Sequence, residues 1–195
     1  MNILSFVGIL NKRFVITKNN TNKIYMNISL SAVLNKQEVF EAIEKYISSF
    51  VRIRYIDSSR PWGGFLVIEE NDSDKFIEQF FSHLKKEDLI ISGKLSPKIL
   101  LVAPQKKLSW QYHHRRAEIW KLIGGEAGVI TSDTDEEKEI KYLQINDIIE
   151  LKQGERHRLL GLNNWGIIAE IWQHTNASHP SDEDDIVRLQ DDFGR

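Results

Sequence analysis

The chain lacks three features that would place it in a specialised class of protein. It has no cysteine, so no disulfide framework supports a secreted fold, and any bound metal must be held by nitrogen and oxygen atoms. No apolar run approaches the ~18–20 residues that a membrane-spanning helix needs, so we expect no membrane partner. The formal net charge is only -2, which argues against a general nucleic-acid binder.

We also expect no secretion signal. Residues 3–10 are apolar but few, with no preceding Lys or Arg and no clear small-residue cleavage site. Residues 1–25 are polar, rich in Asn and without clear periodicity, so Met26 is an alternative start to Met1. These observations favour a cytoplasmic protein.

The composition is that of an ordinary globular protein. A chain of 195 residues is long enough for one full domain with a small appendage, and 41% hydrophobic with 28% charged residues is typical. Basic residues are nevertheless dense in places, and a local cluster in a nearly neutral protein fits a small anion better than a polyanion. The cluster comprises Lys106, Lys107, Arg115, Arg116, Lys121, Arg156 and Arg158.

Two segments before residue 98 have helical periodicity. Asn35 and Glu38 resemble a capping pair, and apolar residues then recur at helical spacing, which predicts a helix over 36–50. Asp72 or Ser73 is the expected start of a second helix with its own apolar stripe. Both stripes are typical of faces that pack on a core.

From residue 98 onward, short β-rich runs alternate with turn signals, which is typical of an all-β sandwich or barrel. The expected strands are 99–103, 108–113, 119–123, 128–132, 138–144, 148–151, 157–162, 166–174 and 186–190. The expected turns include Gly124-Gly125 and Asn163-Asn164, and the polar residues 175–185 are expected to form a loop.

The segment from Gln111 to Glu118, together with His157, offers two imidazoles, an amide and a carboxylate. Two nitrogen and two oxygen donors suit zinc, and also manganese, iron(II) or nickel. Because alternate side chains of a strand share a face, we expect Gln111, His113 and Arg115 on one face and Tyr112, His114 and Arg116 on the other. On spacing alone, the same residues would also fit a solvated strand face.

Four ordered blocks resemble one protein family. The pattern Q-x-H-x4-E followed by G-x-x-H resembles the two cupin motifs, with Gln111 in place of the usual first histidine. LSWQYHHRRAEIW (108–120) looks like the type II mannose-6-phosphate isomerases, which form the C-terminal domain of bifunctional mannose-1-phosphate guanylyltransferases. Three further blocks match in the same order: RPWGGF (60–65), GERHRL (154–159), and DDIVR (184–188) leading to DFGR (192–195).

The resemblance implies a mainly-β cupin jelly-roll barrel, with an N-terminal helical extension, around one divalent metal, zinc being the first choice. It implies Gln111, His113, Glu118 and His157 as metal ligands, with His114 in a supporting role. We expect an N-terminal extension over 1–59 and a cupin domain over 60–195, with a helical insert at about 72–95. Cupins of this kind often pair, so we expect a homodimer.

The chain departs from the family pattern in several places. Arg115 stands where many relatives have a third consecutive histidine, and Lys152 replaces the usual proline before Gly154. The guanylyltransferase part has no counterpart in these 195 residues. Similar stand-alone chains are labelled phosphoheptose isomerase, so the identity of the sugar stays open.

The function that the resemblance implies is a metal-dependent isomerase that interconverts mannose 6-phosphate and fructose 6-phosphate. The alternatives are an isomerase or epimerase of another phosphorylated sugar, such as a heptose phosphate, and a non-catalytic cupin that binds a sugar phosphate. Glu170 is a candidate proton-transfer base, although a strand-face carboxylate is as often structural. The candidates for holding the phosphate are Arg116, Arg158, Lys98, Lys107 and Arg188.

Overall fold

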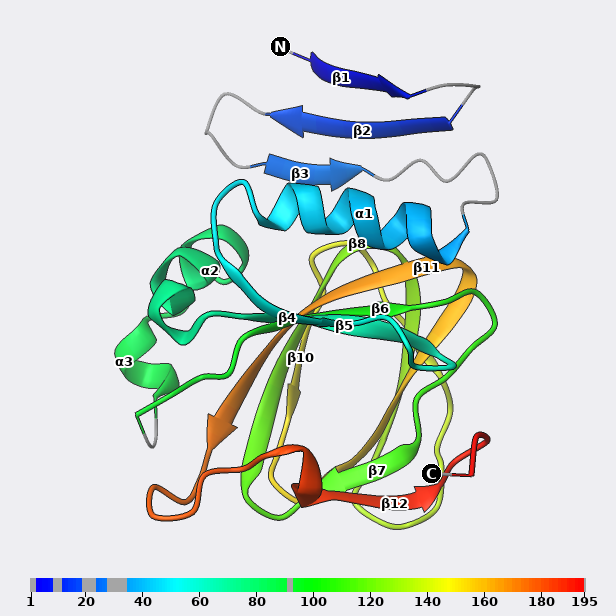
Figure 1. The fold of residues 1–195 in the computed structure, drawn as a ribbon. Helices are drawn as coiled ribbons and strands as arrows, with labels where there is room; N and C mark the ends of the chain where they lie inside the picture. The colour runs from blue at the N-terminus through cyan, green and yellow to red at the C-terminus, as the bar shows by residue number, and fades with distance from the viewer. Residues whose placement is uncertain (1–2, 9–11, 19–23, 28–34, 91–92, 195) are drawn as a thin grey trace.

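A computed structural model describes residues 3–8, 12–18, 24–27, 35–90 and 93–194 (Figure 1). The helices are α1 Lys36–Ile47, α2 Ser73–Phe80 and α3 Lys86–Leu89, with 3-10 turns η1 Glu70–Asp72 and η2 Glu183–Asp185. The strands are β1 Ile3–Gly8, β2 Lys12–Lys18, β3 Ile24–Asn27, β4 Ile53–Asp57, β5 Gly63–Ile68, β6 Lys98–Val102, β7 Trp110–His113, β8 Arg116–Ser132, β9 Lys141–Tyr142, β10 Ile148–Leu151, β11 Arg156–His174 and β12 Ile186–Gln190.

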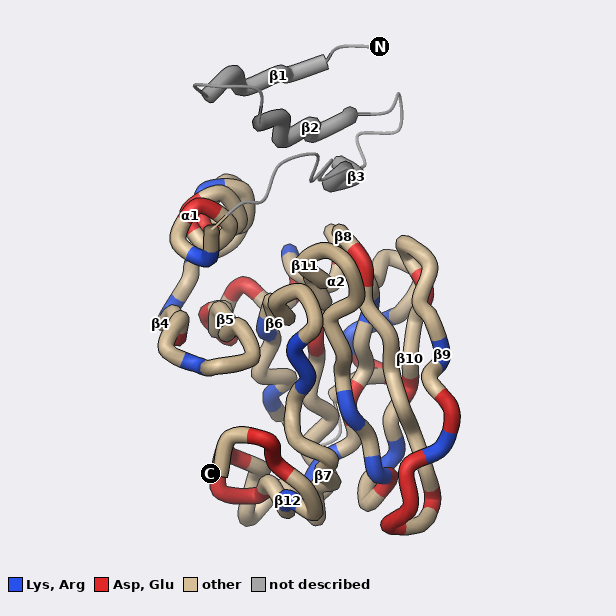
Figure 2. Tube along the Cα trace, turned by 90° about the vertical axis from the view of Figure 1, so that its right-hand side faces the viewer, with Lys and Arg blue, Asp and Glu red and all other residues tan. Residues whose placement is uncertain are grey.

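Two long antiparallel strands, β8 and β11, organise the barrel. β11 pairs with β8 over most of its 19 residues, and the sheet continues in the order β10-β8-β11-β6-β5-β4. β7 pairs with β11 and β12, and both views show β7 and β12 at the end of the barrel remote from α1 (Figures 1 and 2). This arrangement confirms the predicted mainly-β jelly-roll barrel with an N-terminal helix.

The predicted turns at Gly124-Gly125 and Asn163-Asn164 are wrong, because both pairs lie inside the long strands β8 and β11. The pairing shifts register between Gly161 and Gly166, so a bulge absorbs the polar residues without ending the strand. Gly125 makes this possible: its φ is +69°, and a Cβ there would lie 1.7 Å from the Trp165 carbonyl oxygen. Each pair of predicted strands is therefore one bent strand.

Strands β4 and β5 had no counterpart in the sequence analysis. β5 is buried along nearly its whole length, so it lacks the alternation of apolar and polar residues that marks a half-exposed strand. The antiparallel sheet β1-β2-β3 likewise lies where the sequence has no clear periodicity. The proposed division at residue 59 remains a prediction.

Helix α1 forms as predicted at its start and ends earlier, at Ile47. The Asn35 side chain accepts a hydrogen bond from the Glu38 backbone N–H, and the Glu38 carboxylate accepts one from the Asn35 N–H, which completes a capping box. The helix buries Val39, Phe40, Ile43, Tyr46 and Ile47 in the core beside the sheet. At α2, Asp72 accepts hydrogen bonds from the backbone and side chain of Arg52, so its carboxylate does not cap the helix.

Strand alternation separates two apolar cores on the two faces of the β6–β11–β8 layer. Along β11, Ile167, Ala169 and Ile171 belong to the core beneath α1, whereas Ile168 belongs to the core inside the barrel. Because side chains alternate along β11, Glu170 and Trp172 face the barrel interior together with Ile168. None of the described helices is long and apolar enough to cross a membrane.

Removing the capping side chain of α1 should destabilise the protein without touching the barrel interior. Asn35→Ala should lower the free energy of unfolding by about 1 kcal/mol, the usual effect of losing such a cap. Asn35→Asp keeps an acceptor at the same place and should lie within a few tenths of a kcal/mol of the parent. Urea denaturation at neutral pH measures both, and equal losses in the two variants would contradict this role of the cap.

Candidate metal centre and barrel cavity

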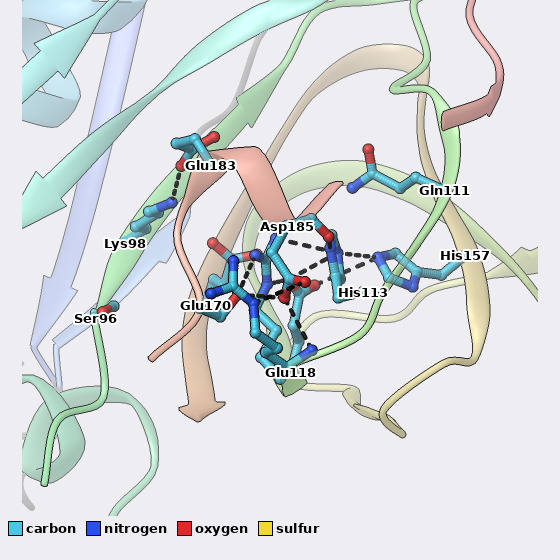
Figure 3. A network of polar contacts seen from close by, with 12 residues as sticks. Ser96, Lys98, Gln111, His113, Glu118, His157, Glu170, Glu183 and Asp185 are labelled. Atoms are coloured by element: carbon cyan, nitrogen blue, oxygen red, sulfur yellow. Dashed lines mark hydrogen bonds and ion pairs between the residues drawn. The ribbon is translucent and has the colours of Figure 1, made fainter. Parts of the chain in front are cut away.

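Three ligand-type side chains meet inside the barrel. His113 ends β7, Glu118 lies near the start of β8, and His157 lies near the start of β11, all three buried. One ligand atom from each lies within 4.8 Å of the other two. The two Nε2 atoms are 3.2 Å apart, and the Glu118 carboxylate lies 3.2 Å from His113 and 3.5 Å from His157 (Figure 3).

The other nitrogen of each imidazole faces a backbone carbonyl. His157 Nδ1 lies 2.9 Å from the Glu155 oxygen, and His113 Nδ1 lies 3.4 Å from the Asp185 oxygen. A carbonyl oxygen can only accept a hydrogen bond, so in the neutral rings Nδ1 carries the proton and Nε2 presents a lone pair. Histidines that bind metals are oriented in the same way.

Two features of this cluster fit a bound cation. The two Nε2 atoms face each other at 3.2 Å, and two imidazole lone pairs at that distance repel each other less when positive charge lies beside them. Two nitrogens bound tetrahedrally to zinc at about 2.0–2.1 Å would be about 3.3 Å apart, close to the separation seen here. The buried Glu118 Oε2 accepts no hydrogen bond from the described residues, which leaves it available to an ion. The residues therefore fit a divalent metal.

The electrostatics of Glu118 favour its ionised form. Burial alone would raise the pKa of this carboxyl, but His113 and the Arg116 guanidinium outweigh it and hold the pKa well below the usual range. For His157, burial is the dominant cause, and it lowers the pKa to about 4. A carboxylate and a neutral imidazole are the protonation states that bind metals.

Gln111, the fourth predicted ligand, lies opposite His157 in the β7–β11 pairing. Its Oε1 accepts a hydrogen bond of 2.6 Å from Ser109 Oγ, and Figure 3 shows its amide beside the two imidazoles with no contact drawn to them. Gln111 lines the same cavity as Glu118. Its part in metal binding stays a prediction.

The predicted faces of Arg115 and Arg116 are wrong. Residues 114 and 115 form the bend between β7 and β8, so strand alternation does not carry through them. Arg116 turns inward, where its Nε donates to Glu118 Oε1 at 2.6 Å and its Nη2 lies 3.1 Å from His113 Nε2. Arg115 turns outward and pairs with Asp185, while His114 is exposed.

Glu170, the candidate base, belongs to a row of neighbours that crosses three strands. In the pairing, Glu170 lies opposite Lys98 of β6 on one side and opposite Trp120 of β8 on the other. Its Oε1 accepts a hydrogen bond of 3.0 Å from Trp120 Nε1. Burial, followed by the negative charge of Glu118, raises the pKa of Glu170 to about 8, so this acid can exchange protons near neutral pH.

Two cations lie over the ring of Trp172. Lys98 Nζ is 3.4 Å and the Arg116 guanidinium carbon 3.6 Å from the ring centroid. The indole N–H of Trp172 is buried and has no acceptor among the described residues. Nothing in the local sequence separates Trp172 from the other four tryptophans of the chain.

Residues 181–185, which we call the covering segment, lie over the end of this site and contact Arg116 and Lys98. Arg116 Nη1 donates to Ser181 Oγ at 2.8 Å and to the Asp182 carbonyl at 3.0 Å. Asp185 accepts hydrogen bonds from the backbone N–H groups of His114 and Arg115 and from Ser181 Oγ. Glu183 pairs with Lys98 at 2.5 Å (Figure 3). Apart from the bond between Ser181 and Asp185, these contacts join residues more than 60 positions apart, so nothing in the local sequence of this acidic run indicates them.

A small cavity joins these groups. Its free volume is about 60 Å³, and Lys98, Gln111, Arg116, Glu118, Glu170 and Arg188 are among its lining residues. Lys107 and Arg158, the other two predicted phosphate ligands, do not line it. Lys107 pairs with Asp192 on the outer surface at 3.2 Å, and Arg158 is buried against Glu137 and the Gln190 carbonyl.

Comparison with known proteins now bears on this site. Residues 80–191, more than half of the chain, match the family described as mannose-6-phosphate isomerase C-terminal. The chain belongs to this family. The match includes all four predicted metal ligands and Glu170, and it begins within α2, so α1, β4 and β5 lie outside it.

Curated relatives match only with part of their length. The chain is 37% identical to a mannose-1-phosphate guanylyltransferase of Escherichia coli over 111 residues, which are 56% of this chain and 22% of that protein. It is 28% identical to one of Salmonella montevideo over 161 residues, or 82% of this chain and 28% of that protein. The chain thus spans less than a third of these relatives.

Among solved structures, the capsular polysaccharide assembling protein CapF of Staphylococcus aureus is similar with a TM-score of 0.49 at 10% identity. The match covers 79% of this chain and 38% of that one.

The metal centre predicts a difference between two adjacent histidines. His113→Ala and His157→Ala should each lose tightly held divalent metal, because each removes a nitrogen of the cluster. His114→Ala changes the exposed neighbour and should keep it. Metal content after loading with zinc and dialysis, measured by mass spectrometry, distinguishes the variants. Equal loss in His114→Ala and His113→Ala would contradict the assignment.

His174 predicts an acid-sensitive part of the stability. Its Nδ1 accepts the Ser181 N–H at 3.1 Å, and burial, followed by Lys94, lowers its pKa to about 4. The unfolded chain, with a histidine pKa near 6.5, then binds the extra proton first, so stability is lost as pH falls from about 6.5 to 4.

Between pH 7 and pH 4.5 the loss from this one group should be about 2 kcal/mol. His174→Asn keeps a neutral acceptor and should lack that part of the loss. Urea denaturation of the metal-free proteins at pH 7 and pH 4.5 gives the comparison. Parallel losses in the parent and the variant would show that His174 does not titrate as described.

Proposed function

We propose that this chain is a metal-dependent sugar-phosphate isomerase that interconverts an aldose phosphate and a ketose phosphate, with mannose 6-phosphate and fructose 6-phosphate as the first choice. The observation that carries the proposal is that Glu170, whose pKa is raised to about 8, lines the same cavity as Glu118 of the metal cluster and Gln111. Family membership supports a function related to sugar phosphates.

Different residues of the cavity would serve different steps of such a reaction. Isomerisation moves a proton between C1 and C2 of the sugar through an enediol. Glu170, held by Trp120 Nε1 on the inner face of β11, would take this proton as a carboxylate and return it as an acid. Lys98, Arg116 and Arg188 line the same cavity and supply positive charge for the phosphate.

His113, Glu118 and His157 would hold the metal, with Gln111 as the fourth donor that the family motif implies. A bound divalent ion would supply Lewis-acid stabilisation of the negative charge that develops on the sugar oxygens. Zinc suits the nitrogen and oxygen donors, as do manganese, iron(II) and nickel.

Two alternatives remain beside this proposal. One is an isomerase or epimerase of another phosphorylated sugar, such as a heptose phosphate, since the cations that line the cavity would pair with the phosphate of any such sugar. The other is a non-catalytic cupin that binds a sugar phosphate. The raised pKa of Glu170 favours an enzyme, because a binding protein has no need of a buried acid that titrates near neutral pH. A homodimer in the cytoplasm remains our expectation.

The role of Glu170 is tested by Glu170→Gln in a coupled assay for conversion of mannose 6-phosphate to fructose 6-phosphate. Turnover should fall by about 10²–10⁴-fold, the usual contribution of a general base, while the metal content stays unchanged. The parent should lose kcat/KM as pH is lowered, since burial raises the pKa of Glu170 and its base form is then depleted.

Glu150→Gln is the matched control, since Glu150 is an exposed carboxylate on β10. It should leave turnover and its pH profile unchanged. Full activity in Glu170→Gln would reject Glu170 as the base. No turnover by the metal-loaded parent would reject this substrate pair and favour another sugar phosphate or a binding role.

A further inference from the structure

The cavity is too small for the ligand class that its lining fits. Its free volume is about 60 Å³, whereas small-molecule sites enclose ~300–1,000 Å³. Four cationic side chains line it: Arg60, Lys98, Arg116 and Arg188. The covering segment adds an anionic side chain to the lining, that of Glu183. Some part of this lining must therefore move when a phosphate-bearing ligand binds.

Glu183 and Lys98 are unequal partners. The Lys98 side chain is 7% exposed, enclosed between Trp172 and the Phe65 ring, whereas the Glu183 side chain is 51% exposed. A buried ammonium needs a counter-charge, because leaving it unpaired carries a large desolvation cost. An exposed carboxylate regains its hydration when it leaves. Lys98 is thus a fixed cation and Glu183 an anion that can be exchanged.

The covering segment is anchored on both sides of Glu183. Arg116 holds Ser181 and the Asp182 carbonyl, and Asp185 is held by the backbone of His114 and Arg115. Burial would raise the pKa of Glu183, but Lys98 outweighs it and lowers the pKa, so Glu183 is ionised at neutral pH. The turn between the anchors can therefore release its tip while its ends stay in place.

We propose that Glu183 is an internal counter-ion that occupies Lys98 in the closed protein and is displaced by the phosphate group of a ligand. A phosphate carries more negative charge than a carboxylate and offers three acceptor oxygens, so it pairs better with Lys98 and the neighbouring arginines. Its departure opens the cavity between Asp182 and Asp185. The inference rests on the proposed function for the sugar part of the ligand, and on the contacts of Lys98 for the phosphate.

Binding of inorganic phosphate to the metal-loaded full chain, measured by calorimetry, tests the displacement. Glu183→Gln removes the competing charge and should tighten the dissociation constant by about tenfold, the size of one hydrogen bond to a charged group. Asp184→Asn removes the same charge from an exposed neighbour on the same turn and should change it less than twofold. Lys98→Met should weaken binding at least tenfold.

Equal changes in Glu183→Gln and Asp184→Asn would overturn the proposal, since they would indicate only the general charge of the turn. Unchanged or weaker binding in Glu183→Gln would overturn it as well. Mannose 6-phosphate should show the same order of affinities among the variants. Unphosphorylated mannose should show no such differences among them. Because no arm depends on turnover, failure of the isomerase proposal and failure of this one are distinguishable.

Hydrogen exchange gives a second measurement that is independent of affinity. A peptide covering residues 181–186 should exchange faster in the parent when phosphate is saturating, and faster in Glu183→Gln without phosphate. Unchanged or slower exchange with phosphate bound would show that the covering segment does not open.

Discussion

The buried carboxylate of Glu118 is the constraint on which the rest of the site depends. An ionised carboxylate inside a barrel is tolerated only when positive charge and hydrogen-bond donors surround it. Arg116 donates to one of its oxygens, and the other oxygen has no donor among the described residues and faces His157. A metal bound by the two imidazoles and this second oxygen would complete the compensation.

The same constraint connects the metal cluster to the covering segment. Arg116 contacts Glu118 and His113 with one part of its guanidinium and Ser181 and Asp182 with another. A metal that takes the lone pair of His113 removes one acceptor of Arg116. Arg116 thus contacts both the ligand cluster and the covering segment, and the ion pair of Lys98 with Glu183 joins the same segment to β6.

Much of the metal cluster could be predicted from the sequence, because strand alternation and the family motifs place His113, Glu118 and His157 together. The same alternation failed two residues later, since the bend at 114 and 115 reverses which arginine points inward. The roles of Trp172 and Glu183 could not be predicted, because they depend on contacts with Lys98, which is 74 and 85 residues away in the chain. The local sequence pattern predicts which side chains share a strand face, but their contact partners from distant parts of the chain become visible only in the fold.

The most direct test of the account is an anomalous diffraction map of crystals of the zinc-loaded protein. The account predicts one ion bound to Nε2 of His113, Nε2 of His157 and the Glu118 carboxylate, at about 2.0–2.2 Å from each, with Arg116 Nη2 moved off His113. An ion bound elsewhere, or an ion-free cluster with Arg116 still on His113 Nε2, would contradict it.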